Sequence, residues 1–366
     1  MSLTRVALVA SWLNQYGGAE RVLEVLHEMF PDAPVYTSMY APEAMPASYR
    51  SWDIRTTFMQ RLPLVTRKHQ LFLPLYPLAF ESLRLNGYDL VISNTSAFAH
   101  GTHTGSGTTH ICYCLTPARF LWDYAGYVRR EQIGRVARSM LPAIIAPLRF
   151  WDRAAAQRVT HYVAISRLVA ERIRTIYRRQ STIIYPPIDA GAFTPSSEYD
   201  DYFLIVSRLI PYKRIDLAVQ AFTRLGLPLR IIGDGRDRAS LEKMAGPSVR
   251  FLGRLPDADV KDQLRHCRAF VFPGEEDFGL APLEAMASGR PVIAYAGGGA
   301  LETVVSGVTG EFFHEPTVDA LAATVETFRP ERFDPITIRR HAETFDRSVF
   351  VQRLRAFVKQ TTGLSV

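Results

Sequence analysis

The sequence contains few cysteines and no long run of apolar residues. The three cysteines among its 366 residues are Cys112, Cys114 and Cys267. An odd number without metal-binding spacing argues against a disulfide framework and favours reduced thiols in a cytosolic protein. Cys112 and Cys114 point the same way from one predicted strand, so we expect both to be ordinary core residues. No apolar run approaches the roughly 18 to 20 residues that a membrane-spanning helix needs.

Internal repeats, low-complexity tracts and a signal-peptide pattern are also missing. The first residues, MSLTRVALVASWLNQ, combine a short charged region with an apolar run, but no cleavage-site pattern follows and a Gly-Gly turn comes next. We therefore interpret this stretch as a buried first strand, and we expect a cytoplasmic protein.

What is present is typical of a globular protein. Hydrophobic residues make up 47% and charged residues 22% of the chain. The length exceeds that of one ordinary core, which predicts two domains. The 43 Lys and Arg against 36 Asp and Glu give a net charge of +7. A basic balance is compatible with anionic small ligands, nucleic acid or an anionic membrane, and charge alone leaves all three open.

Short apolar stretches alternate with helical or loop segments, which predicts parallel, doubly wound sheets of the α/β class. A Pro-Pro turn in 181–193 and the polar residues 194–201 after it predict a domain boundary. The expected strands are 5–11, 35–37, 54–56, 89–93, 110–115 and 161–166 before this boundary, and 202–209, 230–235, 249–255, 269–273, 292–296 and 310–314 after it.

The stretch from Phe272 to Val304, FPGEEDFGLAPLEAMASGRPVIAYAGGGALETV, is the most informative. It predicts two neighbouring strands that each lead through a loop into a helix, one over 281–288 and one from Ala300. Helix N-termini beyond the carboxyl ends of parallel strands favour anionic ligands. Glu276 and Glu284, eight positions apart, would face one cleft, where their carboxylates can accept hydrogen bonds from sugar or ribose hydroxyls.

This stretch resembles the Glu-x7-Glu signature of retaining, nucleotide-sugar-dependent glycosyltransferases of the glycogen-synthase-like superfamily, whose fold is called GT-B. The segments GRPVIAY and GGGALETV are most similar to bacterial mannosyltransferases of O-antigen and exopolysaccharide synthesis. The resemblance implies two Rossmann-like domains facing a cleft, an acceptor domain over 1–190 and a donor domain over 191–345, with a helix in 346–366 crossing back to the first domain. The matching positions are Glu276, Phe278, Gly279, Glu284, Ala285, Gly289, Pro291 and Val292.

Arg208 and Lys213 are five positions apart across a predicted strand-to-helix turn. As bare sequence, such a pair is more often surface charge. The resemblance implies that both bind the donor diphosphate, that Glu284 holds the ribose and that Glu276 contacts the sugar. The catalytic candidates are therefore Arg208, Lys213 and Glu276, and the further donor-binding positions implied are Gly17, Gly18, Gly253, Arg254, Phe278, Gly279, Leu280, Glu284, Gly298 and Gly299.

In the first domain, the stretch LTPARFLWD resembles a mannosyltransferase segment that contains a histidine where this chain has Leu115. A histidine elsewhere, at His100, His103 or His110, would have to replace it, or these three are ordinary loop and strand-end residues. The acceptor-side candidates implied are Thr116, Arg119, Trp122 and Asp123.

Two basic and apolar segments, 55–80 and 139–151, allow two interpretations. They form an amphipathic surface for anionic lipid headgroups, or a solvated basic face over ordinary core helices. The second segment is too short, and too interrupted by Pro142 and Pro147, to cross a membrane. A cytoplasmic protein with peripheral contact on the inner face of the membrane stays an open possibility.

We expect transfer of mannose from GDP-mannose to a lipid-linked saccharide or an oligosaccharide in surface polysaccharide synthesis, with retention of configuration. We expect no cofactor and no catalytic metal, and we attribute the Asp257-Ala-Asp259 pattern to the start of a helix. The alternatives are a UDP-sugar-dependent glycosyltransferase, a nucleotide-sugar epimerase, a phosphorylase and a non-catalytic sugar-nucleotide binding module. Only the charge suggests nucleic acid, which we do not expect as a partner.

Overall fold

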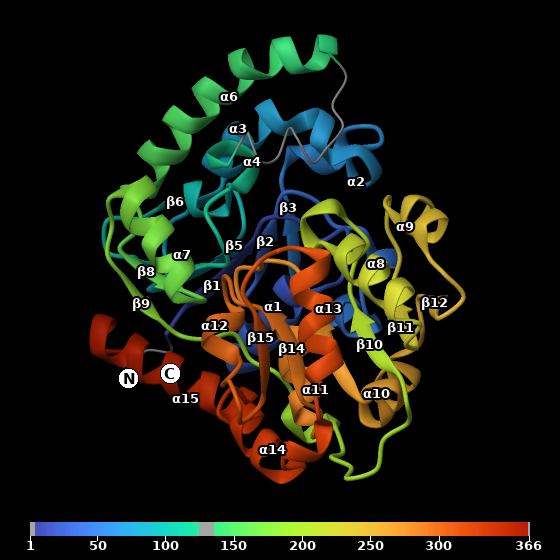
Figure 1. Ribbon diagram of the computed structural model, residues 1–366. Coiled ribbons are helices and arrows are strands. Elements are labelled where there is room, and N and C mark those ends of the chain that lie inside the picture. Colours follow the sequence, from blue (N-terminus) through green and yellow to red (C-terminus); the bar gives the residue numbers. More distant parts are fainter. Residues whose placement is uncertain (1–3, 124–134, 365–366) are drawn as a thin grey trace. The chain divides into compact units, whose positions relative to one another are not determined.

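The computed structural model of the chain describes residues 4–123 and 135–364, and the side chains of 139–141 in the second basic and apolar segment lie outside the described part. The chain forms two compact units. Unit 1 comprises Met1–Pro187 together with Phe350–Val366, and unit 2 comprises Ile188–Val349. Figure 1 traces the course of the chain through both.

Unit 1 contains a seven-stranded parallel sheet, with the strand order β3-β2-β1-β5-β7-β8-β9. Its central strands are buried on both faces, which explains their uninterrupted apolar sequences. The strands are β1 (Val6–Ala10), β2 (Val35–Thr37), β3 (Ile54–Thr56), β5 (Leu90–Thr95), β7 (Thr109–Cys114), β8 (His161–Ala164) and β9 (Ser181–Ile183), and a separate pair is formed by β4 (Arg84–Leu85) and β6 (His103–Thr104).

Helices cover both faces of the unit 1 sheet. Val9 and Val91 share a core cluster with Phe80 of α3 and Leu148 of α6 on one face. Tyr113 points to the opposite face, where its ring lies 5.6 Å from that of Phe350 in α15. The helices of this unit are α1 (Gly18–Met29), α2 (Val65–Lys68), α3 (Tyr76–Ser82), α4 (Arg119–Trp122), α6 (Arg135–Ala156), α7 (Arg167–Arg172) and α15 (Arg347–Thr362).

Helix α6 differs from the expectation for this segment. Pro142 and Pro147 do not interrupt it, and the helix runs for 22 residues. Both prolines lie on its exposed side, where a lost intrahelical hydrogen bond costs less than it would in a dry core. None of the described helices combines the length and the apolar content that crossing a bilayer requires.

Unit 2 contains a six-stranded parallel sheet, with the strand order β12-β11-β10-β13-β14-β15. The two parallel sheets and the return of α15 to unit 1 confirm the predicted fold class. The strands are β10 (Phe203–Val206), β11 (Leu229–Ile232), β12 (Val249–Gly253), β13 (Ala269–Phe272), β14 (Val292–Tyr295) and β15 (Gly310–Phe313). The helices are α8 (Ile215–Leu225), α9 (Arg238–Met244), α10 (Asp257–His266), α11 (Leu280–Ala287), α12 (Ala300–Thr303), α13 (Val318–Thr327) and α14 (Pro335–Glu343).

All three cysteines are free and buried, which confirms the prediction that Cys112 and Cys114 are core residues. Asp257 is the first residue of α10, so the Asp257-Ala-Asp259 pattern occupies the first turn of that helix. Carboxylates at this position favour the helix because they face its positive end.

Candidate active site

The strand order of unit 2 reverses between β10 and β13, because β10 continues to β11 on one side and β13 continues to β14 on the other. Open α/β sheets bind ligands at such a switch point, outside the carboxyl ends of the strands. The loops that follow these two strands contain Arg208, Lys213 and Glu276. The fold therefore brings the predicted catalytic residues to the place where this class of sheet binds ligands.

Lys213 and Glu276 form an ion pair between Nζ and Oε1. Their side chains are only 13% and 18% exposed, so the pair is partly shielded from water. The ring of Tyr212 lies 5.4 Å from Nζ. This arrangement joins one predicted diphosphate-binding cation directly to the predicted sugar-binding carboxylate, and the spacing of the two residues in the sequence gives no indication of it.

The two loops touch through their backbones as well. A Cβ at Gly274 would lie 2.6 Å from the carbonyl oxygen of Lys213, so only glycine allows this approach. Lys213 ends a short 3-10 turn, Pro211–Lys213, and Arg214 after it adopts a left-handed conformation with φ 52°. The ammonium group is thus carried by a closely packed turn.

Arg208 lies on the same loop, directly after β10, and is exposed. It forms no ion pair with another described residue. Gly233 and Gly235 support this loop from β11, because a Cβ on them would lie 1.9 Å and 2.2 Å from the carbonyl oxygens of Ser207 and Leu209. Arg208 and Lys213 therefore lie on one loop, but their side chains do not contact each other through a hydrogen bond.

The predicted donor-binding glycines Gly298 and Gly299 have a clear packing role. The backbone N–H of Gly299 donates to the carbonyl oxygen of Glu276 over 2.8 Å. A Cβ at Gly299 would lie 2.2 Å from the Cα of Phe278, and Gly298 has φ 59° and an equally close approach to the Glu276 carbonyl oxygen. These glycines therefore hold the acidic loop in position, whatever else they contact.

Helix α11 begins with Leu280, immediately after Gly279 in a left-handed conformation with φ 94°. Phe278 is 3% exposed, and its ring lies 5.9 Å from that of Phe345. Glu284 is on the second turn of the helix and is buried at 8% exposure, slightly further from the helix start than predicted. A buried carboxylate so close to the switch point is suited to binding polar ligand atoms.

Gly253 ends β12 at the same carboxyl edge, two strands from β10. Gly253 has a φ of 70°, a conformation that favours glycine. Its carbonyl oxygen accepts a hydrogen bond from the Gly233 N–H over 2.7 Å. The local backbone conformation therefore accounts for glycine at this position. Arg254 follows with an exposed side chain.

In unit 1, the strand order reverses between β1 and β5, and α1 begins just after β1. Gly17 precedes this helix in an extended conformation with φ −170°, and Gly18 is its first residue. A Cβ at Gly17 would meet only the Glu20 carboxylate, at an ordinary 3.6 Å. Packing within the described chain therefore does not require glycine at Gly17, in contrast to Gly274 and Gly299.

The four acceptor-side candidates follow β7, but their side chains have different surroundings. Thr116 Oγ1 accepts a bond from Arg172 over 3.2 Å. Trp122 donates its indole N–H to buried Asp152 over 2.7 Å, and the guanidinium of Arg153 lies 4.6 Å from its ring. The N–H of Trp122 is thus committed to the interior of unit 1. Arg119 lies in α4, and Asp123 after it is exposed.

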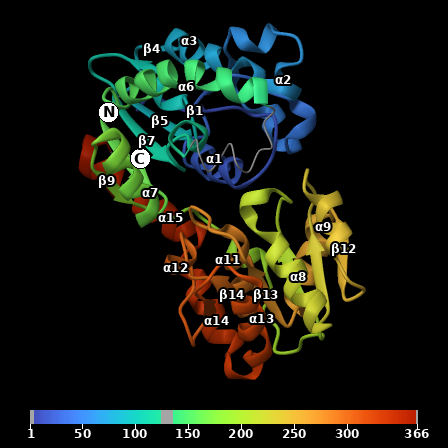
Figure 2. The same ribbon diagram turned by 45° about the horizontal axis from the view of Figure 1, so that its top comes forward.

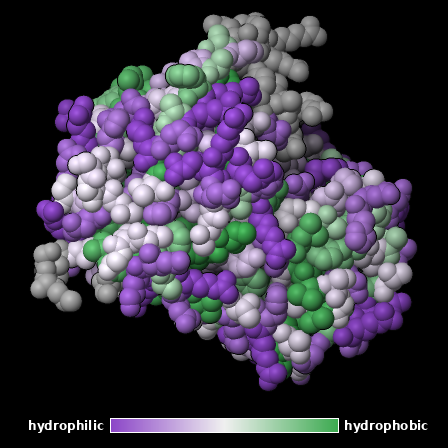
Figure 3. All heavy atoms as spheres, turned by 90° about the vertical axis from the view of Figure 1, so that its left-hand side faces the viewer, coloured by the Kyte–Doolittle hydropathy of each residue, from purple (hydrophilic) through white to green (hydrophobic). Residues whose placement is uncertain are grey.

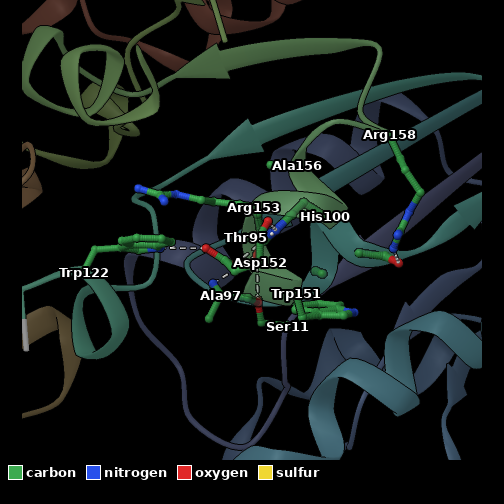
Figure 4. A network of polar contacts seen from close by, with 12 residues as sticks. Ser11, Thr95, Ala97, His100, Trp122, Trp151, Asp152, Arg153, Ala156 and Arg158 are labelled. Atoms are coloured by element: carbon green, nitrogen blue, oxygen red, sulfur yellow. Dashed lines mark hydrogen bonds and ion pairs between the residues drawn. The ribbon is translucent and has the colours of Figure 1, made fainter. Parts of the chain in front are cut away.

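Two of the three histidines considered as replacements for a histidine at Leu115 are unsuitable, because they are buried. His100 is 2% exposed and lies 3.2 Å from the Asp152 carboxylate, as Figure 4 shows. His110 lies near the start of β7, at the other end of the strand from Leu115, and its Nε2 is 2.9 Å from Ser93 Oγ. His103 is half-exposed in the small β4-β6 pair.

Sequence reasoning missed His69. Its ring lies 5.0 Å from that of Trp12, which follows the carboxyl end of β1, and its Nδ1 is 3.1 Å from the Tyr76 hydroxyl. Burial lowers the pKa of His69, which favours a neutral imidazole at pH 7. The residue begins an irregular 3-10 segment, His69–Leu75, which has no periodicity that sequence reasoning could detect.

The buried histidines predict how stability depends on pH. Burial, with the charges of His100 and Arg158, lowers the pKa of His110 to about 3. Below pH 6.5 the unfolded chain therefore binds a proton that the folded chain does not, and unit 1 should lose about 1.4 kcal/mol of stability per pH unit of acidification. The slope should become shallower in His110→Gln, because this variant loses the contribution of His110 while His69, whose pKa is also lowered by burial, keeps its own. Denaturant unfolding followed by tryptophan fluorescence measures it, since all four tryptophans are in unit 1. Equal slopes for both proteins would contradict the assignment.

For His100, burial alone would lower the pKa, but the hydrogen bond and charge of Asp152 raise it above the usual value. The stability from this pair is present below pH 6.5 and is lost as the pH rises through the raised pKa. The two histidines therefore act in different pH ranges, and of the two it is His110 that contributes to the loss of stability in acid.

The chain is similar to known glycosyltransferases in two adjacent regions. Residues 16–191 match the family described as Glycosyltransferase Family 4, and residues 192–332 match Glycosyl transferases group 1. A GDP-mannose-dependent alpha-mannosyltransferase of Mycobacterium tuberculosis is 27% identical over 325 residues, which cover 84% of this chain and 82% of that protein.

Two further similarities differ in extent. A GDP-mannose-dependent monoacylated alpha-(1-6)-phosphatidylinositol monomannoside mannosyltransferase of Corynebacterium glutamicum is 30% identical over 190 residues, 43% of this chain and 50% of that protein. This chain spans about half the length of several such relatives. The solved structure of Anabaena HepE in complex with UDP is 17% identical, with a TM-score of 0.71 over 98% of this chain and 100% of that one. One glycosyltransferase family thus matches most of the first unit and another matches most of the second, and the fold of the whole chain is similar to that of HepE.

Proposed function

We propose that the protein transfers mannose from GDP-mannose to a hydroxyl of a lipid-linked saccharide, with retention of configuration. The observation that carries the proposal is the ion pair of Lys213 and Glu276 at the switch point of unit 2, beside exposed Arg208. A nucleoside diphosphate needs fixed cations as it leaves, and the sugar needs a carboxylate that accepts hydrogen bonds from its hydroxyls.

In the proposed reaction, the bond between the anomeric carbon and the diphosphate oxygen breaks, and its electron pair stays on the phosphate. Arg208 and Lys213 stabilise the new charge on the departing diphosphate. The acceptor hydroxyl forms the new bond, and its proton passes to the departing diphosphate. Glu276 holds the sugar and Glu284 the ribose. In this scheme the cations of the chain itself carry the electrostatic stabilisation, and we propose that no metal ion or cofactor takes part.

The choice of donor and acceptor rests on the relatives. The names of the Mycobacterium and Corynebacterium proteins specify GDP-mannose, and the second also specifies a phosphatidylinositol mannoside as acceptor. UDP is the rival, because Anabaena HepE was solved with it, although at 17% identity that similarity supports the fold alone. A lipid-linked acceptor also fits synthesis of surface polysaccharide at the cytoplasmic side of the membrane.

A thermal-shift panel tests the donor. A ligand at a hundred times its Kd adds about 2.7 kcal/mol of stability, so binding is easily detected. We expect GDP and GDP-mannose to raise the transition temperature, and UDP, ADP and their sugar conjugates to leave it unchanged. A shift with a UDP-sugar and none with GDP-mannose would overturn the choice of donor.

Turnover separates transfer from the other activities of this fold. We expect GDP release from GDP-mannose only when a mannoside acceptor is added, and the same rate with a metal chelator. Formation of an epimer, phosphate-dependent cleavage, or binding without GDP release would each contradict a transferase. A rate abolished by the chelator and restored by a divalent cation would contradict a reaction without metal.

A further inference from the structure

Two neighbouring segments of unit 1 expose large apolar side chains. Leu71 and Phe150 are 73% and 79% exposed, the highest values among the large hydrophobic residues that the structure describes. Leu64 and Leu78 are both 59% exposed, and Ile144 is 37% exposed. Single exposed leucines are common on protein surfaces, but a group of this size on adjacent elements is typical of an interaction site.

The two segments pack against one core, which places them on the same side of unit 1. Ile145 and Leu148 of α6 belong to the same buried cluster as Val65 of α2 and Phe80 of α3. Trp151 of α6 also donates a hydrogen bond to Glu81 of α3 over 2.8 Å. Figures 1 and 2 both show α6 running beside α3.

Helix α6 is apolar on its outer side as well as its inner side. Ile145 and Leu148 face the core, whereas Ile144, Pro147 and Phe150 face outwards. Figure 3, seen from the side along which α6 runs, shows hydrophobic residues at the surface near its top. An ordinary solvated helix would present charged and polar residues there. These exposed apolar residues favour the interpretation of this segment as an amphipathic surface over that of a solvated basic face.

The charge around these apolar residues is mostly positive, and the nearby acid Glu81 is paired with Arg158 over 3.3 Å. Residues 54–80 contain no Asp or Glu. Arg61, Arg67 and Lys68 are exposed and form no ion pair with a described residue. In α6, the only acidic residue from 142 to 156 is Asp152, which is fully buried. Basic residues beside exposed apolar ones complement a surface that is anionic at its headgroups and apolar below them.

We propose that this basic apolar face, defined by Arg61, Leu64, Arg67, Lys68, Leu71, Ile144 and Phe150, docks on the anionic surface of a lipid bilayer. Phe150, Ile144, Leu64 and Leu71 enter the headgroup boundary, and the three cations pair with lipid phosphates. The proposal deepens the proposed function, because it brings the enzyme to the surface that carries a lipid-linked acceptor, but it stands on the exposure and charge of unit 1 alone.

Vesicle flotation of the full chain tests the proposal. We expect it to float with vesicles of phosphatidylcholine and phosphatidylglycerol, to stay behind with phosphatidylcholine alone, and to detach at high salt. Each basic residue near an anionic membrane contributes about a fivefold gain in binding, so Arg67→Gln with Lys68→Gln should weaken binding on the order of thirtyfold. Leu71→Glu with Phe150→Glu should weaken it about tenfold or more, because both apolar contacts are replaced by like charge.

The matched control replaces Met244 and Ile336 of unit 2 by glutamate, since these are 37% and 49% exposed and lie outside the face. The control should float like the parent, and all variants should keep the parent's transition temperature. No flotation with anionic vesicles, equal flotation with neutral ones, or equal losses in the control would overturn the proposal. The thermal shift with GDP-mannose is measured on the same variants and should be unchanged. A chain that floats without responding to any nucleotide sugar would defeat the proposed function and leave the docking face standing.

Discussion

Replacing Lys213 by alanine is expected to lower kcat by about a hundredfold or more while the protein stays folded. One lost charge-assisted contact to a developing anion costs on the order of 3 kcal/mol of transition-state stabilisation. The loss should be at least this large, because the ammonium group is positioned by a packed turn and is only 13% exposed. A steady-state assay with GDP-mannose and a mannoside acceptor measures it.

Two comparisons make the result specific. Lys243 in α9 is exposed and far along the chain from the site, so Lys243→Ala should retain the parent's rate. Lys213→Arg retains the charge on a larger planar group and should recover only part of the rate. A near-normal kcat for Lys213→Ala, with an unchanged transition temperature, would mean that this residue does not bind the leaving diphosphate.

Replacing Asp152 by alanine should destabilise unit 1 by about 3 to 5 kcal/mol, the usual result of removing one partner of a buried ion pair. Asp152 is fully buried and accepts the N–H of Trp122 while it faces the imidazole of His100 (Figure 4). Without the carboxylate, the indole N–H of Trp122 loses its acceptor, and the imidazole of His100 loses the negative charge beside it in the interior. Denaturant unfolding followed by tryptophan fluorescence measures the change, because unit 2 has no tryptophan.

Asp152→Asn serves as the graded comparison for this effect. An amide oxygen can still accept the indole N–H, but it cannot attract a protonated imidazole. We therefore expect Asp152→Asn to destabilise unit 1, but by less than Asp152→Ala does. The nucleotide thermal shift of unit 2 should be unaffected in both variants. A change of less than about 1 kcal/mol for Asp152→Ala would show that the network contributes little net stability.

Much of the fold could be predicted from the sequence because the strands are buried on both faces. Such strands have continuous apolar runs, and the predicted 269–273 and 292–296 contain β13 and β14, which are buried along almost their whole length. The stretch from Phe272 to Val304 was also informative, since each strand ends in glycine or proline before a helix begins. Sheet order, in contrast, depends on contacts between distant segments, so the switch points became visible only in the structure.

The details of the site could not be predicted, for physical reasons that differ between residues. The ion pair of Lys213 and Glu276 joins loops from two separate strands, and no local pattern encodes that contact. Gly299 was interpreted as a donor-binding position, yet its close approach to Phe278 already requires glycine. The uninterrupted length of helix α6 was not expected, because proline normally ends a helix. Two exposed prolines are tolerated here, where packing through Leu148 and Asp152 holds the other side of the helix.

The polypeptide passes between the two units twice, at Pro187–Ile188 and again at Val349–Phe350. The two passages are bonded to each other, because Ile188 exchanges backbone hydrogen bonds with Phe345 and Arg347, and the Ala190 N–H donates to the Asp346 carboxylate over 3.2 Å. A single proteolytic cut in either passage would therefore leave the units tethered through the other. Removing the chain from Phe350 onwards would leave unit 2 intact, but it would uncover the face of the unit 1 sheet on which Tyr113 packs against Phe350. A fragment of unit 2 prepared for separate study should accordingly span Ile188–Val349, which retains the hydrogen bonds between Ile188 and the segment Phe345–Arg347.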